Sequence, residues 1–122
     1  MNNKIEVMKC EKLSKLPNKE NYILINVSLT KPKEMLNIKD IEEINIPINQ
    51  IIKNLSLFKN KIPIFYDHSG IIVKNNLHQF NKIPLKKIYL LSSGLITKEF
   101  FKLPFPHKKL IEIDKASCSK QS

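Results

Sequence analysis

Hydrophobic residues gather in three nearly unbroken runs along the chain, at 21–27 (NYILINV), 62–66 (IPIFY) and 87–91 (KIYLL). Such runs, with little polar alternation, are typical of parallel strands that are buried on both faces of a sheet. Two shorter segments, IEVM at 5–8 and IEEINIP at 41–47, each predict a further short strand. The pattern therefore predicts a sheet whose central strands are parallel.

Helical spacing appears between these runs. An apolar stripe at positions i, i+3, i+4 and i+7 predicts a core-facing helix over about 47–57, with Pro47 in its first turn: Ile48, Ile51, Ile52 and Leu55. A second stripe predicts a helix that ends before Pro84: Val73, Leu77 and Phe80. The segment CEKLSKL at 10–16 predicts a short helix ended by a proline.

Strands that alternate with helical segments predict an α/β fold of three layers, with a central, mostly parallel sheet flanked by helices. A chain of 122 residues matches the usual size of one domain, and we assign it to 1–113. Within that domain, 96–103 predicts a last short helical or irregular piece, and 104–113 predicts an irregular segment that contains one edge strand. The polar segment 114–122 has no apolar anchor and is expected to be disordered.

The charge of the chain limits the partners that we expect. It carries 21 lysines, no arginine and a formal net charge of +10, and the lysines spread along the whole sequence. Without arginine or a basic stripe, we expect only non-specific electrostatic contact with nucleic acid, and an unidentified protein as partner. A steep dependence of binding on salt would instead favour a nucleic-acid-associated protein. No apolar run is long enough for a membrane span, so we expect a cytoplasmic protein.

The cysteines and histidines show no metal-ligand spacing. His68, His78 and His107 follow no helical pattern, so we expect no metal site and no cofactor. Cys10 is expected to pack in the domain. Cys118, in the polar tail, leaves two interpretations open: an exposed thiol without a special role, or the carrier of sulfur in a relay.

The segment KIPIFYDHSG at 61–70 runs from a strand straight into a polar turn. Right-handed crossovers place such strand-to-helix loops along one edge of a parallel sheet, where open α/β sheets hold their sites. Asp67 lies at this junction. We expect Ser69 to cap the following helix, and Gly70 and Gly94 to serve as turn residues.

Several segments, in order, resemble the rhodanese-like sulfurtransferase family. NYILINVS is similar to the strand that ends in an Asp-Val-Arg signature, and DIEEINIP to the His-Ile segment that leads into an INIP motif. IPIFYDHSG resembles the strand and active loop Val-Val-Tyr-Cys-x-Ser-Gly, and KKIYLLSSGL the closing strand with its Gly-Gly turn. The resemblance covers about residues 5 to 103 and implies a rhodanese-like domain with its active loop at 67–72.

The departures from the family pattern fall on its polar groups. Asp67 stands where the resemblance implies the catalytic cysteine, and Asn26 and Ser28 replace the aspartate and arginine of the first strand. Asp40 stands where the family pattern has the histidine of its His-Ile segment. Ile72 stands where the pattern has an arginine that would hold an anionic substrate. The resemblance therefore implies a degenerate active site.

A carboxylate cannot carry a persulfide, so no rhodanese-type transfer and no catalytic residue are expected at Asp67. The side chain is, however, an anion of suitable size to lie among the N–H groups of the loop. A phosphate-accepting role would need neighbouring carboxylates for Mg²⁺, and the first strand ends in Asn26 instead. A dyad of Asp67 with His68 is not favoured, because adjacent residues seldom face one another.

The resemblance implies a vestigial active-site loop without the catalytic cysteine. It comprises Asp67, His68, Ser69, Gly70, Ile71 and Ile72. If both isoleucines are exposed they form a contact surface for another protein; if one packs inward, a single exposed side chain remains. We interpret the chain as a catalytically inactive rhodanese-like domain that acts as a protein-interaction or regulatory module. The alternative is a sulfur-relay accessory protein that uses Cys118.

Overall fold

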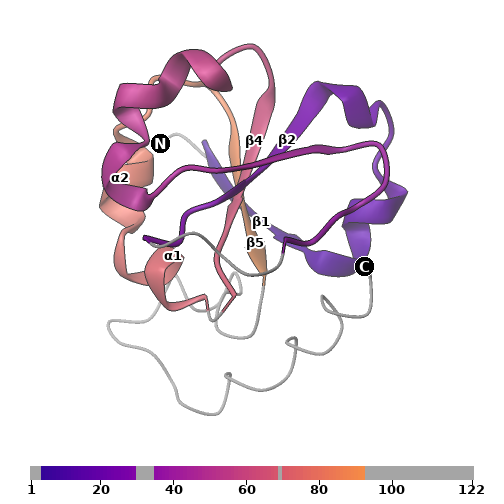
Figure 1. Cartoon of the computed structure of the whole chain (residues 1–122), viewed down its shortest axis with the longest axis horizontal. Helices are drawn as coiled ribbons and strands as arrows, with labels where there is room; N and C mark the ends of the chain where they lie inside the picture. Colours follow the sequence, from indigo (N-terminus) through magenta and orange to yellow (C-terminus); the bar gives the residue numbers. More distant parts are fainter. Residues whose placement is uncertain (1–3, 30–34, 69, 93–122) are drawn as a thin grey trace.

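The computed structural model describes residues 4–29, 35–68 and 70–92, which form an α/β fold around a parallel sheet (Figure 1). The order of the five strands across the sheet is β1-β5-β4-β2-β3, and every neighbouring pair is parallel. Their bounds are β1 Ile5–Lys9, β2 Tyr22–Asn26, β3 Glu42–Asn45, β4 Ile62–Tyr66 and β5 Ile88–Ser92. The predicted fold class is confirmed, and each of the five strands predicted between residues 5 and 91 is present.

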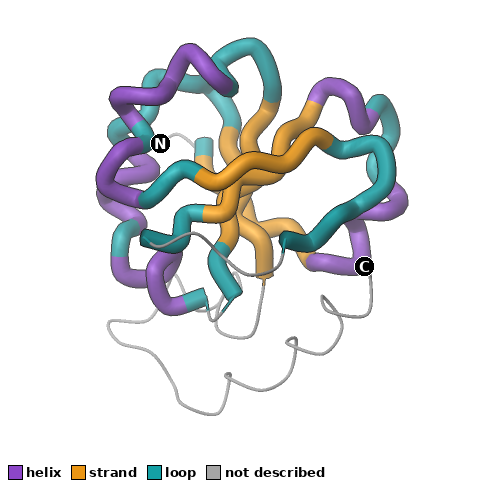
Figure 2. Tube along the Cα trace, in the orientation of Figure 1, coloured by secondary structure: helices purple, strands orange, loops and turns teal. Residues whose placement is uncertain are grey.

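Short helical segments cover both faces of this sheet (Figure 2). Two are α-helices, α1 (Ile71–Asn75) and α2 (Leu77–Asn81). The others are 3₁₀ helices: η1 Cys10–Lys15, η2 Lys19–Asn21, η3 Ile48–Gln50 and η4 Ile52–Leu57. Among the described residues, no helix has both the length and the apolar character needed to cross a membrane.

The alternation of side chains along each strand divides the interior into two cores, one on either face of the sheet. Ile25 and Phe65 belong to the core beneath α1 and α2, whereas Leu24 and Ile64 belong to the core beneath η1. All four side chains are fully buried. The unbroken apolar runs of the sequence follow from this burial on both faces.

The single helix predicted over 47–57 is wrong, because the chain forms η3 and η4 there instead. The predicted core-facing stripe is only partly present, because Ile48 and Ile51 are buried but Ile52 is 52% exposed. In a 3₁₀ helix, residues three apart share a face, while residues four apart lie about 120° apart around the axis. The tighter winding therefore turns Ile52 away from the core that Ile48 and Ile51 share.

The helix predicted from Val73, Leu77 and Phe80 is divided in two at Asn76. Asn76 has φ −125° and ψ 29°, and its side-chain amide donates a 2.7 Å hydrogen bond to the carbonyl of Ile72. Asparagine competes in this way with the regular helical hydrogen bonds. The apolar stripe is nevertheless confirmed, since all three side chains pack in or against the core beneath α1 and α2.

Other predictions fall on parts of the chain that the structure does not describe. They are the helical piece at 96–103, the edge strand at 104–113, the tail at 114–122, the turn residue Gly94, and His107 and Cys118.

Candidate functional site

The candidate site lies where β2 and β4 end side by side. Asn26 of β2 is paired in register with Tyr66 of β4. The backbone N–H of Val27 donates to the carbonyl of Tyr66 at 2.9 Å, which extends the pairing beyond the strands. Both strands run in the same direction, so their carboxyl ends present their loops at one edge of the sheet, as the sequence predicted.

The side chain of Asp67, the next residue, turns into its own loop. Its Oδ2 accepts hydrogen bonds from the backbone N–H groups of Gly70 at 3.1 Å and Ile72 at 3.4 Å, and its Oδ1 accepts one from Val73 at 3.1 Å. Asp67 is only 2% exposed. The carboxylate therefore occupies the position at which these N–H groups converge, and it satisfies donors at the start of α1.

Gly70 allows the chain to make this turn. Its φ of 78° lies in the left-handed region, which glycine enters without the steric cost of a Cβ atom. The N–H of Gly70 points at both the side chain and the carbonyl of Asp67, and its own carbonyl accepts from Lys74. The prediction that Gly70 is a turn residue is confirmed. Ser69, predicted to cap the helix, lies outside the described residues, and the N-cap position is occupied by Gly70.

The two isoleucines of the loop have different environments. Ile71 is 47% exposed, whereas Ile72 packs against the core beneath α1 and α2. Of the two interpretations that the sequence left open, the one with a single exposed isoleucine is correct. His68 is exposed, and its ring centroid lies 6.4 Å from that of Tyr66 in an edge-on arrangement.

Other residues that the sequence resemblance singled out lie in turns or form structural hydrogen bonds. Asn26 is fully buried, and its Oδ1 accepts a 2.9 Å hydrogen bond from the backbone N–H of Ser28. The side chain of Asn45 donates to the carbonyls of both residues. Asp40 lies exposed in a turn with φ 69°, a conformation that aspartate tolerates better than most residues.

Sequence reasoning missed a second polar network on the opposite face of the sheet. The hydroxyl of Tyr66 donates to Oε2 of Glu43, and the same carboxylate accepts from the backbone N–H groups of Leu36 at 2.9 Å and Asn37 at 2.8 Å. Burial, together with the hydrogen bond to Glu43 and its charge, raises the pKa of Tyr66 well above its usual value. The network fixes the 36–41 segment over the sheet.

A signal for this network was present in the segment IEEINIP. Strand alternation places Glu42 and Glu43 on opposite faces, and Glu43 is in register with the buried Leu24. Glu42 is exposed and pairs with Lys61 at 2.9 Å. A carboxylate on the buried side of a strand requires hydrogen-bond donors, so Glu43 could have been identified as part of an internal network.

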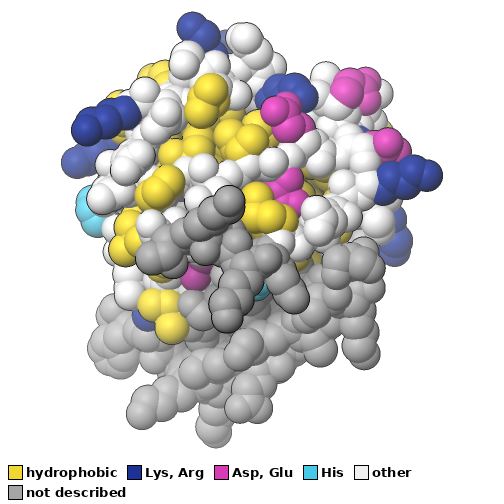
Figure 3. Space-filling view, viewed as in Figure 1, with side chains coloured by type: hydrophobic (Ala, Val, Ile, Leu, Met, Phe, Trp, Pro, Cys, Tyr) yellow, Lys and Arg dark blue, Asp and Glu magenta, His cyan; other side chains and the backbone are white. Residues whose placement is uncertain are grey.

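The remaining candidate groups do not join the loop into a reactive site. Cys10 is buried and disulfide-bonded, while Cys118 lies outside the described residues. Within 4–29, 35–68 and 70–92, no group of three or more His, Cys, Asp and Glu side chains is arranged to hold a metal ion. On the face in Figure 3, the described lysines lie in small groups around the rim and form no continuous basic patch.

The loop thus combines a buried carboxylate with backbone donors that are directed at it. Such donors would otherwise be available to a bound anion. No protein-family model, no curated protein and no solved structure matches this chain. The functional argument therefore depends on the residues and geometry of the loop.

Proposed function

We propose that this protein is a catalytically inactive rhodanese-like domain that acts as a protein-interaction or regulatory module in the cytoplasm. The observation that carries the proposal is the contact of the Asp67 carboxylate with the N–H groups of its own loop. In the rhodanese-like reaction implied by the resemblance, these donors would stabilise the charge on a cysteine persulfide. Here the protein supplies its own anion.

Two features of the fold support the proposal. Asp67 directly follows a central strand and precedes α1, which is the strand, loop and helix arrangement that the family pattern requires. The segments that resemble the family also occur on β2, β3, β4 and β5 in the expected order. The resemblance is thus compatible with how the chain folds.

The charge of Asp67 explains why a bound substrate is not expected. Thiosulfate and phosphate are anions, and either would have to displace or approach a carboxylate that is already hydrogen-bonded and almost fully buried. Ile72, at the position of the substrate-binding arginine, offers only an apolar side chain. The loop therefore keeps its fold and loses its affinity for anions.

Sulfur transfer from thiosulfate to cyanide, measured with the purified full chain, tests the proposal. We expect no activity in the parent protein or in Cys118→Ser. The single variant Asp67→Cys tests whether this position can again accept sulfur, with Asp67→Ser as a matched control that lacks a thiol. Activity in the parent that disappears in Cys118→Ser would contradict the proposal and support the sulfur-relay alternative.

A further inference from the structure

β1 forms one edge of the sheet. It pairs with β5 along its whole length, from Ile5 with Ile88 to Lys9 with Ser92, and no other described strand pairs with it. The outer side of an edge strand presents backbone N–H and C=O groups that can pair with an added strand, and proteins commonly cover such edges. The surroundings of β1 are therefore a place where a further segment of the chain would fit.

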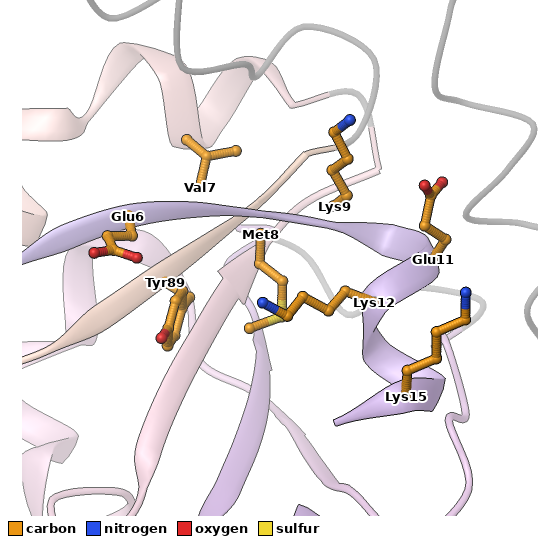
Figure 4. Close-up of a pocket in the computed structure, with 8 residues that line it drawn as sticks. All are labelled: Glu6, Val7, Met8, Lys9, Glu11, Lys12, Lys15 and Tyr89. Carbon is orange, nitrogen blue, oxygen red and sulfur yellow. The ribbon is translucent and has the colours of Figure 1, made fainter. Parts of the chain in front are cut away.

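A cavity of about 380 Å³ lies beside this strand. Its lining comes from β1, η1 and β5 (Figure 4): Glu6, Val7, Met8, Lys9, Glu11, Lys12, Lys15 and Tyr89. The first four are consecutive residues of β1, so the cavity follows the length of the strand. This shape suits an extended chain better than a compact ligand. We call this surface the β1 groove.

The residue directly after β1 is covalently bonded to another part of the chain. Cys10, the first residue of η1, is 3% exposed and disulfide-bonded. The sequence contains two cysteines, and the other is Cys118. A disulfide within one chain therefore joins Cys10 to Cys118, which brings the residues that precede Cys118 close to the end of β1.

The connection between the two cysteines begins and ends at the same end of β1. Residue 93 follows Ser92, which is paired with Lys9, and Cys118 is bonded to the next residue, Cys10. A strand added parallel to β1 would run towards this end, and the crossover before it needs a dozen or more residues. The segment 93–117 is long enough for both. An antiparallel strand would instead require 114–117 to span the whole of β1 again.

The last part of this segment has the sequence of a strand. Residues 107–113 (HKKLIEI) contain no proline, whereas Pro104 and Pro106 immediately precede them. Because side chains alternate along a strand, Ile111 and Ile113 would lie on one face and could extend the apolar core there. The strand would therefore begin after the prolines and end shortly before Cys118.

The charges of the groove suit this placement. Lys9, Lys12 and Lys15 are exposed near the carboxyl end of β1, and they form no ion pair with another described residue. In a strand parallel to β1, Glu112 and Asp114 would lie towards that same end. Opposite charges would then meet where the segment returns to its disulfide.

We propose that residues 93–117, held by the disulfide between Cys10 and Cys118, cover the β1 groove, with 107–113 added to the sheet as a strand parallel to β1. Reduction of the disulfide would release the segment and expose the strand edge. The accessibility of this edge would therefore depend on the redox state of the two cysteines. The inference takes from the proposed function only its cytoplasmic setting, where thiol reductants act on disulfides.

The release is a thiol–disulfide exchange with a dithiol reductant. Because Cys10 is buried, a thiolate of the reductant would attack the sulfur of Cys118, and Cys10 would leave as a thiolate. The second thiolate of the reductant would then displace Cys118 from the mixed disulfide. The reductant ends as a disulfide, and the two protons that it loses complete the two cysteine thiols. Two electrons thus pass from the reductant to the protein.

Tryptic mapping of the full chain, equilibrated with oxidised glutathione, tests the bond. The peptides 10–12 (CEK) and 116–120 (ASCSK) should be recovered joined to each other, and the intact protein should be a monomer lighter than the reduced chain by two hydrogen atoms. Recovery of the two peptides unlinked, or a disulfide-linked dimer, would overturn the inference.

Hydrogen exchange of the β1 amides, followed by NMR, tests the covering strand. In the oxidised protein, the β1 amides that point away from β5 should be protected. They should exchange at least about tenfold faster after treatment with dithiothreitol, and equally fast in Cys118→Ser without it. The neighbouring variant Ser119→Ala, which keeps the disulfide, should match the oxidised parent.

Equal exchange of these amides in the oxidised and reduced parent would overturn the covering strand, even if the disulfide is present. So would a Cys118→Ser variant as protected as the oxidised parent. Amides that point towards β5 report whether the sheet itself stays folded, and they should be unchanged throughout. None of these readouts measures sulfur transfer or alters Asp67, so failure here and failure of the proposed function are distinguishable.

Discussion

The Oδ1 atom of Asp67 lies 3.1 Å from the backbone nitrogen of Val73, six residues further along the chain. This contact ties the end of a central strand to the first helix that follows it, and it places a negative charge among the loop donors. The stability of the loop depends on this interaction, and the proposed loss of anion binding follows from it. The first predictions therefore concern this side chain.

Asp67→Ala should destabilise the protein and create an anion site. Loss of the carboxylate leaves buried N–H groups without their acceptor, which costs about 2 kcal/mol of the free energy of unfolding. Sulfate or phosphate should then bind the vacated loop and raise the Tm of the variant. Thermal denaturation with increasing sulfate, against sodium chloride at matched ionic strength, measures this effect. An equal rise in Tm for the parent protein would contradict the account.

Asp67→Cys should place a thiol of lowered pKa in the loop. Backbone N–H groups directed at the sulfur favour the thiolate over the neutral thiol. The pH dependence of alkylation by iodoacetamide, followed by peptide mapping to distinguish the introduced thiol from the native cysteines, gives this pKa. A value at or above that of an ordinary cysteine, about 8.5, would mean that the loop donors do not stabilise an anion.

Gly70→Ala should destabilise the loop through its backbone. At φ 78° a residue with a Cβ atom meets the preceding backbone, at a cost of about 1 to 2 kcal/mol. Gly70→Asn should cost less, because asparagine enters the left-handed region more readily. Urea denaturation of both variants checks this order. An alanine variant as stable as the parent would show that the turn does not need glycine.

Tyr66 and Glu43 should be energetically coupled. Removing the hydroxyl in Tyr66→Phe leaves the carboxylate with fewer donors, and Glu43→Gln weakens its bonds to the tyrosine and to the 36–41 segment. A double-mutant cycle by urea denaturation should give a coupling energy of about 1 kcal/mol. Additive effects of the two substitutions would contradict the network.

The same network predicts how stability depends on alkaline pH. The pKa of Tyr66 is raised in the folded state, so its contribution is fully present below its ordinary value of 10.0 and is lost as the pH rises above that value. Stability should therefore fall above about pH 10, and less steeply in Tyr66→Phe. Chemical denaturation across this pH range makes the comparison. Identical slopes in the two proteins would refute the assignment to Tyr66.

The strands were predictable because burial on both faces of a parallel sheet leaves unbroken apolar runs such as IPIFY. The helical segments were less so. Apolar spacing identified the core-facing residues Val73, Leu77 and Phe80, but it did not reveal the break at Asn76 or the 3₁₀ winding that exposes Ile52. Local hydrogen bonds decide these details, and hydrophobic periodicity does not report them.

The candidate site was predictable only in part. The strand-to-loop junction located Asp67, and the chemistry of a carboxylate suggested its contact with loop N–H groups. The link between Tyr66 and Glu43 joins residues far apart in the sequence, and the apolar run around Tyr66 gave no indication of a buried hydroxyl bond.

Calorimetric titration of the full chain with thiosulfate, beside the same titration of Asp67→Ala, tests the central claim most directly. If the loop donors are already occupied by Asp67, the parent shows no binding at millimolar thiosulfate and the alanine variant binds. Binding by the parent that is lost in Asp67→Ala would show instead that the aspartate helps to hold the anion, and it would contradict the account.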